Sequence, residues 1–409
     1  MTQTVQYSLF ASRPKEATLV GLRAFAHILL LLLVFTIPWE DQFVLSGVGT
    51  LCRAVGASAF AVGMFAVVID GQIRIPRPSH VALAAFVIWG AFTAFWTVDI
   101  DVTVASLKTY SQLLVLTWLI YEFAPTAETQ RNLLRAYVLG TWVSAAGTVY
   151  SYYSASETYW ERSVAAGFDP NDLCVILAIS VPMSFYLMTV DTAGLRGWLW
   201  RLHPVVVIPA GLLTASRGGF IAICGALLII PLVARRLPRV SKVILGSSVV
   251  LAIFGLVGSI PAARWERIAT IPQELTSGTL GDRRLIWAAG LQLFRESPGV
   301  GIGLGAFSSA VDKYLGSGVV AHNAYLTVLV ETGLLGAVLL GVALVLMVAQ
   351  LRRLDYPERR LWWIILLTWS VGAMSLSWAH RKPTWLLFAL LAASCRPLLR
   401  RALWRNSAL

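Results

Sequence analysis

Charged residues are scarce in this 409-residue chain, where Asp, Glu, Lys and Arg together make up 13%. Ordinary soluble domains carry about 25%, so a soluble globular enzyme and a disordered protein are both excluded. Cysteine is also sparse, and none of the four cysteines forms a C-x-x-C pair. Each lies in or beside an apolar run, so we interpret all four as small buried residues and not as a zinc site or a disulfide framework. They are Cys52, Cys174, Cys224 and Cys395.

Apolar residues, in contrast, make up 57% of the chain. A membrane-spanning helix needs roughly 20 mostly apolar residues, and the runs here lack the alternation of an outer-membrane barrel. We therefore expect an all-α polytopic membrane protein, one integral membrane domain over residues 1–409, with about 12 transmembrane helices. The expected spans are 20–38, 43–69, 81–97, 102–123, 132–155, 172–190, 202–216, 217–235, 241–260, 322–351, 361–378 and 384–399.

Most of the 33 Lys and Arg residues lie at span ends that share one side if the N-terminus is cytoplasmic. Because an excess of Lys and Arg marks the cytoplasmic side, the net charge of +12 indicates membrane orientation and not nucleic-acid binding. An even number of spans then places both termini in the cytoplasm. It also places one large loop, residues 261–321, on the outer side.

The 261–321 loop departs from this charge rule because it carries six basic residues, Arg264 and Arg267 among them. They are either surface arginines or parts of a cationic pocket for an anionic ligand in the outer leaflet. Within the loop, Arg283 and Arg284 precede an apolar spacing that predicts a helix along the membrane surface, where a helix N-terminus favours an anion. The residues of that spacing are Leu285, Ala288, Ala289, Gln292 and Phe294.

Arg217 lies between two apolar runs and is followed by Gly218 and Gly219. A charge at membrane depth costs at least a few kcal/mol and usually marks function. The guanidinium group is a flat fork of donors that suits phosphate oxygens and keeps its charge. The alternative is a turn residue whose side chain reaches the headgroups.

His322 opens the tenth expected span, and Glu331 follows within it. Histidine is the side chain best suited to accept a proton near neutral pH, and nearby arginines would keep it neutral. The alternative is an interfacial histidine at a helix start. We interpret Glu331 as a buried structural carboxylate, with a role in a proton relay as the alternative. The alternating glycines of 299–305 predict a tight loop, with an anion-binding nest as the alternative.

Acidic pairs could hold a divalent cation, because hard cations prefer carboxylate oxygens. Glu40 with Asp41, and Asp99 with Asp101, are such pairs on outer connections. The arginine-rich cluster can neutralise a pyrophosphate without metal, however, so we expect neither a metal nor another cofactor.

Together these motifs resemble the O-antigen ligase and O-antigen polymerase superfamily of bacterial inner-membrane glycosyltransferases. Their order and spacing over residues 165–345 carry the resemblance, since each motif alone is weak. The matching motifs are Phe168–Asn171, Ser216-Arg217-Gly218, Arg283-x-x-x-Trp287, Pro298–Gly303, His322-Asn323-x-x-Leu326 and Glu331-x-Gly333.

The resemblance implies a GT-C-like architecture and glycan transfer on the periplasmic face. The donor would be an O-antigen glycan on undecaprenyl pyrophosphate, and the acceptor a hydroxyl of lipid A–core oligosaccharide. Arg217 and either Arg283 or Arg284 would bind the pyrophosphate, and His322 would be the general base of an inverting, metal-independent transfer. We also expect five residues to bind substrate: Asn171, Arg264, Arg267, Asn323 and Tyr325.

Chain length and the single large outer loop favour a ligase. A polymerase or a protein O-oligosaccharyltransferase of the same superfamily is the alternative, and a flippase of lipid-linked oligosaccharides is an alternative of another class. The expected partners are the two glycolipid substrates and membrane lipids, without nucleic acid or an obligate protein partner. The expected location is the bacterial inner membrane.

Overall fold

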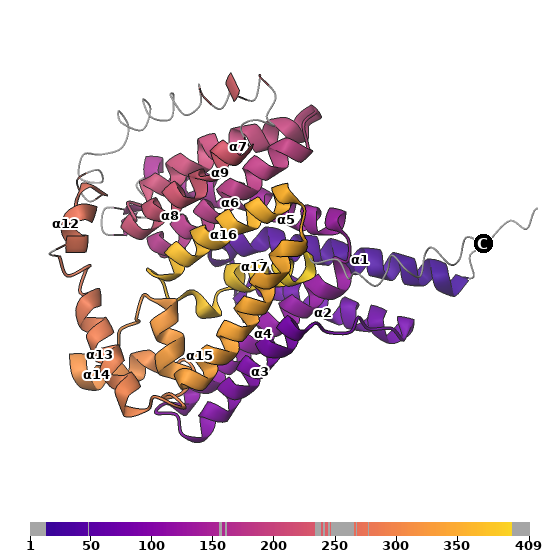
Figure 1. Ribbon diagram of the computed structural model, residues 1–409. Coiled ribbons are helices and arrows are strands. Elements are labelled where there is room, and N and C mark those ends of the chain that lie inside the picture. The colour runs from indigo at the N-terminus through magenta and orange to yellow at the C-terminus, as the bar shows by residue number, and fades with distance from the viewer. Residues whose placement is uncertain are drawn as a thin grey trace, which may run out of the picture.

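The apolar runs form helices in the computed structural model of the chain. The structure describes residues 14–47, 49–154, 158–159, 162–233, 239, 242–243, 246, 266, 268–276 and 278–394. Among these residues, the longest helices pack side by side in a bundle (Figure 1). They are α1 (Pro14–Thr36), α2 (Leu51–Asp70), α3 (Pro78–Phe92), α4 (Ile100–Phe123), α5 (Ala127–Ser154), α6 (Pro170–Val190), α7 (Gly194–Leu213), α15 (Ala324–Gln350) and α16 (Tyr356–Ala373).

Shorter elements connect or extend this bundle. The helices are α8 (Arg217–Leu227), α9 (Ile229–Val233), α12 (Ile271–Thr276), α13 (Arg283–Glu296), α14 (Phe307–Leu315) and α17 (Lys382–Ser394). The 3-10 turns are η1 (Ile37–Gln42), η2 (Thr93–Phe95), η3 (Leu351–Arg353) and η4 (Trp378–His380). Two antiparallel hairpins complete the set: β1 (Val44–Leu45) with β2 (Gly49–Thr50), where Val44 faces Thr50, and β3 (Thr158–Tyr159) with β4 (Arg162–Ser163), where Thr158 faces Ser163.

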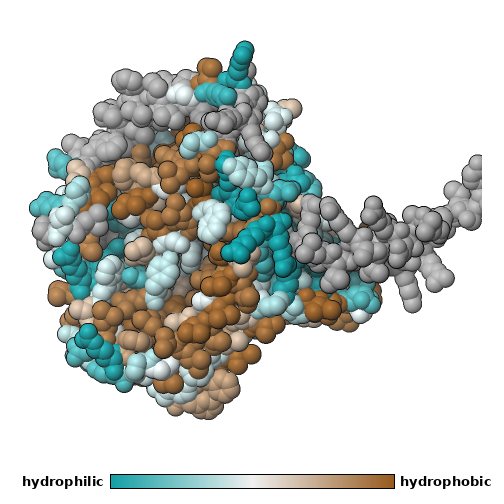
Figure 2. Space-filling view, in the orientation of Figure 1, coloured by the Kyte–Doolittle hydropathy of each residue, from teal (hydrophilic) through white to brown (hydrophobic). Residues whose placement is uncertain are grey.

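Five helices of the described residues are long and apolar enough to cross a membrane. They are Leu19–Gln42, Leu51–Asp70, Pro78–Phe95, Pro170–Val190 and Ala324–Arg353. Figure 2 shows hydrophobic side chains over much of the middle of one face, with hydrophilic ones gathered toward its left and right edges. This is the arrangement of an all-α membrane protein.

The remaining expected spans have mixed outcomes. Helices α4, α5, α7, α16 and α17 occupy five of them, but their polar residues or short described length keep them out of the apolar set. The expected span 43–69 starts late, because a hairpin takes up its first residues and α2 begins at Leu51. The expected span 241–260 lies almost entirely outside the described residues. The count of about 12 spans stays a prediction.

Ion pairs join the helices at the end of the bundle where the sequence places the cytoplasm. Arg23 of α1 lies 2.6 Å from a carboxylate oxygen of Asp70, at the end of α2, and 3.0 Å from one of Glu122, near the end of α4. Arg135 of α5 forms a 2.7 Å pair with Asp191, directly after α6. Because Asp191 follows the end of α6, the start of α6 belongs to the opposite end. The starts of α8 and α15 lie near it, because Ser216 bonds Asn171, and His322 bonds Ser377, whose neighbour Trp378 bonds Asp172.

Helix α15 is broken at Gly333, where φ is 66°. A break frees backbone groups that an apolar environment would leave unsatisfied, and the 298–303 loop satisfies them. The bonds are Ile302 N to Val330 O (3.1 Å), Gly303 N to Glu331 O (3.0 Å) and Leu334 N to Pro298 O (2.9 Å). The predicted tight glycine loop is confirmed. It supplies the backbone hydrogen bonds that α15 lacks at its break.

The loop also requires its glycines. Gly301 has a φ of 76°, and a Cβ there would lie 2.4 Å from the carbonyl oxygen of Glu331. Glu331 itself is 5% exposed, and its carboxylate accepts a 3.4 Å hydrogen bond from the backbone of Phe307. Its environment is that of the buried structural carboxylate expected from the sequence.

Helices α12, α13 and α14 lie together at the left of Figure 1, at the same end as α8. Helix α13 packs into a small apolar core with α14 and α15 through Ile286, Trp287, Ala289, Leu293 and Phe294. Two residues of the expected apolar spacing, Ala289 and Phe294, lie in this core, whereas Leu285, Ala288 and Gln292 are exposed. The orientation of α13 depends on the hydrophobic side chains of α14 and α15. It could therefore not be predicted from the sequence of α13 alone.

Two of the cysteines follow the expectation. Cys52 and Cys174 are buried and unbridged, whereas Cys224 is exposed on α8. The expectation for Cys224 was therefore wrong, because it lies on the side of α8 that faces away from α6 and α16. Cys395 lies outside the described residues.

Candidate active site

Arg217 is the first residue of α8, directly after the turn that joins α7 to α8. Ser216 caps the helix, because its hydroxyl oxygen accepts a 3.1 Å hydrogen bond from Gly219 N. Ala215 adopts a left-handed φ of 49°, and this makes the turn sharp enough to reverse the chain. Arg217 is thus held at a helix N-terminus, where backbone N–H groups already favour an anion.

A buried arginine lies beneath this turn. Arg162 is 5% exposed, and its Nε donates a 2.6 Å hydrogen bond to the carbonyl oxygen of Thr214. Its Nη2 donates to Oδ1 of Asn171 at 2.9 Å, and the Ser216 hydroxyl donates to the same oxygen at 2.8 Å. These bonds tie the turn before Arg217 to the start of α6.

Arg217 has partners in the segment between α9 and α13. Its Nη1 forms a 2.7 Å ion pair with Oε1 of Glu274 in α12 and donates to the Thr270 hydroxyl at 3.3 Å. A Cβ added to Gly281 would lie 3.8 Å from Nη2 of Arg217, so the chain just before α13 also approaches it. Residues far apart in sequence therefore meet around this guanidinium.

Arg283 begins α13 and is half-buried. Burial and the nearby Arg217 guanidinium lower the pKa of Arg283, and Asp169 opposes this shift. Two guanidinium groups that repel each other in this way favour an anion between them, and a diphosphate carries the charge to neutralise both. Arg284, the next residue, is exposed.

His322 lies two residues before α15, with a left-handed φ of 47°. Its backbone N donates a 3.1 Å hydrogen bond to the Ser377 hydroxyl, which fixes this unusual conformation from the α16–α17 connection. Burial and the Arg283 guanidinium lower the pKa of His322, against the opposing charges of Asp169 and Asp172. The imidazole is therefore neutral near pH 7 and able to accept a proton.

The start of α6 supplies the negative charge in this region. Asp169 caps the helix, with Oδ1 accepting hydrogen bonds from Asn171 N at 2.8 Å and Asp172 N at 3.2 Å, and Pro170 takes the first helical position. Asp172 accepts a 2.9 Å hydrogen bond from Trp378 Nε1 and forms an ion pair with Arg381. The structure thus brings Arg217, Arg283 and His322 together beside two carboxylates.

The other residues expected to bind substrate have structural contacts. Asn171 bonds Arg162 and Ser216, as described above, and Asn323 caps α15 by accepting from the backbone N of Tyr325 and Leu326, both at 3.1 Å. The Tyr325 ring is exposed, and its hydroxyl donates to Ser370 O at 3.3 Å. Arg264 and Arg267 lie outside the described residues. Substrate binding by all five stays a prediction.

Arg162 and Arg381 are the residues that the motifs missed. Their partners are 52 and 209 positions away in the chain, for Thr214 and Asp172 respectively. The available signal was weak: both are basic residues on the side that the charge rule leaves poor in Lys and Arg.

The acidic pairs weighed for a metal have other partners. Asp99 caps α4 and accepts a 2.7 Å hydrogen bond from the Ser309 hydroxyl, whereas Asp101 is exposed within the first turn. Glu40 forms an ion pair with Lys382. Among the described residues, three or more His, Cys, Asp or Glu side chains nowhere form a group that could hold a metal ion.

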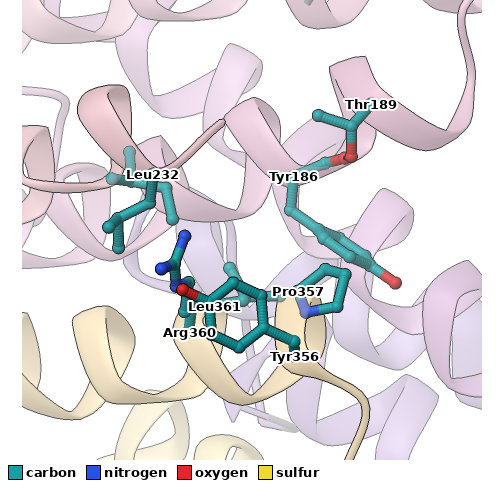
Figure 3. A pocket seen from close by; sticks show the side chains of 8 residues that line it. Tyr186, Thr189, Leu232, Tyr356, Pro357, Arg360 and Leu361 are labelled. Atoms are coloured by element: carbon teal, nitrogen blue, oxygen red, sulfur yellow. The ribbon is translucent and has the colours of Figure 1, made fainter. Parts of the chain in front are cut away.

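A small pocket lies between α6, α9 and α16, at the end of α6 away from Asp172 (Figure 3). Tyr186, Leu232 and Tyr356 line it, and the Arg360 guanidinium lies over the Tyr356 ring, 3.6 Å from its centroid. At 1.5 Å per residue, Tyr186 is about 21 Å along the helix from Asp172. The pocket is therefore separate from the arginine–histidine cluster.

Comparison with known proteins agrees with the motifs. Residues 205–341 match the sequence model of a family described as O-antigen ligase. The matched segment includes Arg217, Arg283 and His322, whereas Asp172 and Arg381 lie outside it. A search of curated proteins gave no match. The resemblance drawn from the motifs is thereby confirmed for residues 205–341, and this match supports the O-antigen ligase and polymerase superfamily.

Proposed function

We propose that this protein is an O-antigen ligase, which transfers an O-antigen glycan from undecaprenyl pyrophosphate to a hydroxyl of lipid A–core oligosaccharide. The observation that carries the proposal is the meeting of Arg217, Arg283 and His322 at one end of the bundle. They come from the starts of α8, α13 and α15, and two of them carry the positive charge that a diphosphate needs.

The acceptor oxygen attacks the anomeric carbon of the donor sugar and forms the new glycosidic bond. The bond from that carbon to the pyrophosphate oxygen breaks, and its electron pair leaves with the pyrophosphate. The proton of the acceptor hydroxyl moves to the imidazole of His322, the general base. One displacement of this kind inverts the anomeric centre.

The arginines act where charge develops. As the glycosidic oxygen leaves, the pyrophosphate gains negative charge, and a guanidinium group placed beforehand stabilises that charge without reorganisation. Arg217 and Arg283 fit this role, because both are partly shielded from solvent and close enough to repel each other. Neither a metal nor another cofactor is required by this chemistry.

Both substrates are amphiphiles, so the site belongs near a membrane surface. We place the chain in the bacterial inner membrane, with both termini in the cytoplasm and the cluster facing the periplasm. The loop that contains α12, α13 and α14 is then the large periplasmic loop. The arginine-rich end with Arg23 and Arg135 supports this orientation, since basic residues collect on the cytoplasmic side.

Reconstitution of the purified protein with lipid-linked O-antigen and rough lipopolysaccharide tests the proposal. Glycan on the lipid A–core supports a ligase, and undiminished transfer in EDTA supports a metal-independent reaction. Longer lipid-linked chains would indicate a polymerase instead, and glycan on added protein an oligosaccharyltransferase. Donor movement across the bilayer without transfer would indicate a flippase.

Variants connect the activity to the cluster. Arg217→Ala and His322→Ala should each reduce transfer by about 10²-fold or more, because each removes charge stabilisation or the base. Arg295→Ala is the matched control, an exposed arginine of α13 outside the cluster. If His322→Ala retains transfer, histidine is not the base.

A further inference from the structure

The connection between α16 and α17 holds two parts of the cluster at once. Its Ser377 hydroxyl accepts the 3.1 Å hydrogen bond from His322 N. The next residue, Trp378, donates from Nε1 to Oδ1 of Asp172 at 2.9 Å, and Arg381 forms an ion pair with Oδ2. One short segment therefore links the start of α6 to the residue expected to accept the proton.

Both carboxylate oxygens of Asp172 are engaged, and the residue is only 9% exposed. A buried carboxylate without partners would be strongly destabilising, and an ion pair with an added hydrogen bond offsets much of that cost. The Trp378 and Arg381 donors bind different oxygens of the carboxylate, Oδ1 and Oδ2, and so restrict its rotation. Asp172 is thus a rigid negative charge, with little freedom to move toward solvent.

The charges that act on His322 come from two elements. Arg283, at the start of α13, disfavours a positive imidazole, and Asp169 and Asp172, at the start of α6, favour one. Ser377 is uncharged and contacts the backbone N of His322. Arg381 forms an ion pair with Asp172 and so offsets part of the negative charge of that carboxylate. A base that gains a positive charge beside Arg283 needs a compensating negative charge nearby.

We propose that Asp172, fixed by Trp378 and Arg381, is a positioning carboxylate that stabilises the imidazolium of His322 during glycan transfer. This inference rests on the proposed function, in which the acceptor proton moves to His322. The proton stays on the imidazole until solvent takes it up, and no bond to Asp172 forms or breaks. Asp172 acts by its charge and by its fixed position.

Asp172→Asn is the first test, because the amide keeps the size of the side chain and an oxygen that can accept from Trp378. Without the negative charge, His322 binds its proton more weakly. The acid limb of kcat/KM should therefore move to lower pH by about one unit, and kcat should fall because the base is weaker. Arg381→Gln removes the positive charge that offsets the Asp172 carboxylate. The acid limb should therefore move to higher pH in this variant. A general loss of folded protein cannot produce shifts of opposite sign.

Carbethoxylation of His322 by diethyl pyrocarbonate gives a reading that does not depend on transfer. The reagent modifies neutral imidazole, so mass spectrometry of the His322 peptide between about pH 5 and about pH 8 follows its protonation. The same opposite shifts are expected in the two variants. Glu122→Gln is the matched control, since it removes a buried carboxylate paired with arginine at the other end of the bundle.

The outcomes separate this inference from the function on which it rests. If His322→Ala abolishes transfer but both Asp172→Asn and Arg381→Gln keep the wild-type pH dependence of carbethoxylation, Asp172 has no influence on His322 and the inference is wrong. If His322→Ala retains transfer, the proposed function itself fails at its base. A shift in Glu122→Gln equal to that in Asp172→Asn would also overturn the inference.

Discussion

Glu274 of α12 forms a 2.7 Å ion pair with Arg217, the arginine that we expect to bind the donor pyrophosphate. The two side chains are each 24% exposed, so the pair is partly open to water. A carboxylate in this position competes with a phosphate for the same guanidinium donors. Helix α12 therefore supplies a carboxylate that would compete with the proposed donor headgroup.

Glu274→Gln should consequently strengthen donor binding. Removing an exposed competing carboxylate is worth up to about 1 kcal/mol, which corresponds to a KM for the lipid-linked donor lower by up to about fivefold. Steady-state transfer with varied donor measures this change. Glu296→Gln is the control, because Glu296 pairs with Lys313 in the same loop, away from Arg217. An unchanged or higher KM in Glu274→Gln would show that the pair does not compete with the donor.

Arg283 and Arg284 should differ in importance, although they are adjacent. Arg283 is half-buried beside Arg217 and His322, whereas Arg284 is exposed. We expect Arg283→Ala to lower kcat/KM by about 10²-fold, as for loss of one charge-stabilising donor. Arg284→Ala should change it by less than about threefold, in line with an exposed charge. The assay is transfer in proteoliposomes, and the reverse order would assign the pyrophosphate contact to Arg284.

The pH dependence of transfer should reflect the environment of His322. Burial and the Arg283 guanidinium lower the pKa of His322 below its usual 6.5, so the neutral base persists into mildly acidic solution. We expect kcat/KM to fall only below about pH 6.5. In the Arg283→Ala background the limb should move upward, since one cause of the lowered pKa is gone. A limb above pH 6.5 in the wild-type protein would contradict the lowered pKa.

The glycine loop offers a matched pair of substitutions. Gly301→Ala places a Cβ 2.4 Å from the Glu331 carbonyl oxygen at a left-handed φ of 76°, whereas a Cβ at Gly299 meets nothing within 4 Å. Such backbone strain costs about 1–3 kcal/mol. Gly301→Ala should therefore lower the thermal transition in detergent, and Gly299→Ala should leave it near the wild-type value. Equal stability of the two variants would mean that the loop does not depend on the close approach.

The sequence predicted much of this arrangement, for identifiable reasons. Arg217 and His322 interrupt or open apolar runs, so their positions at helix starts follow from local pattern alone. Long apolar runs likewise predicted the helices themselves. The pairing of Asp172 with Arg381 has no local signature, because the two residues meet only when α6 and α17 pack within the same bundle.

The orientation of α13 shows the same limit. Its own sequence offers more than one apolar stripe, and the one that is buried depends on α14 and α15. The late start of α2 has a different cause, since the hairpin before it is apolar enough to resemble the start of a span. The sequence therefore predicted the helix-start positions of the proposed site residues better than it predicted the residues that support them.

The break at Gly333 has a consequence for how the protein matures. Trp89 of α3 donates a 2.8 Å hydrogen bond to Thr332 O, and Trp96 donates a 3.1 Å bond to Gly301 O. The backbone groups at the break in α15 thus form hydrogen bonds with two other segments. One is α3, which is synthesised long before α15, and the other is the 298–303 loop, which is synthesised just before it. Unsatisfied backbone groups are not tolerated in lipid. Helix α15 can therefore reach its final position only after α3 and the 298–303 loop have bound to the break. The candidate active site should therefore form late in membrane insertion, when the last third of the polypeptide packs against the first third.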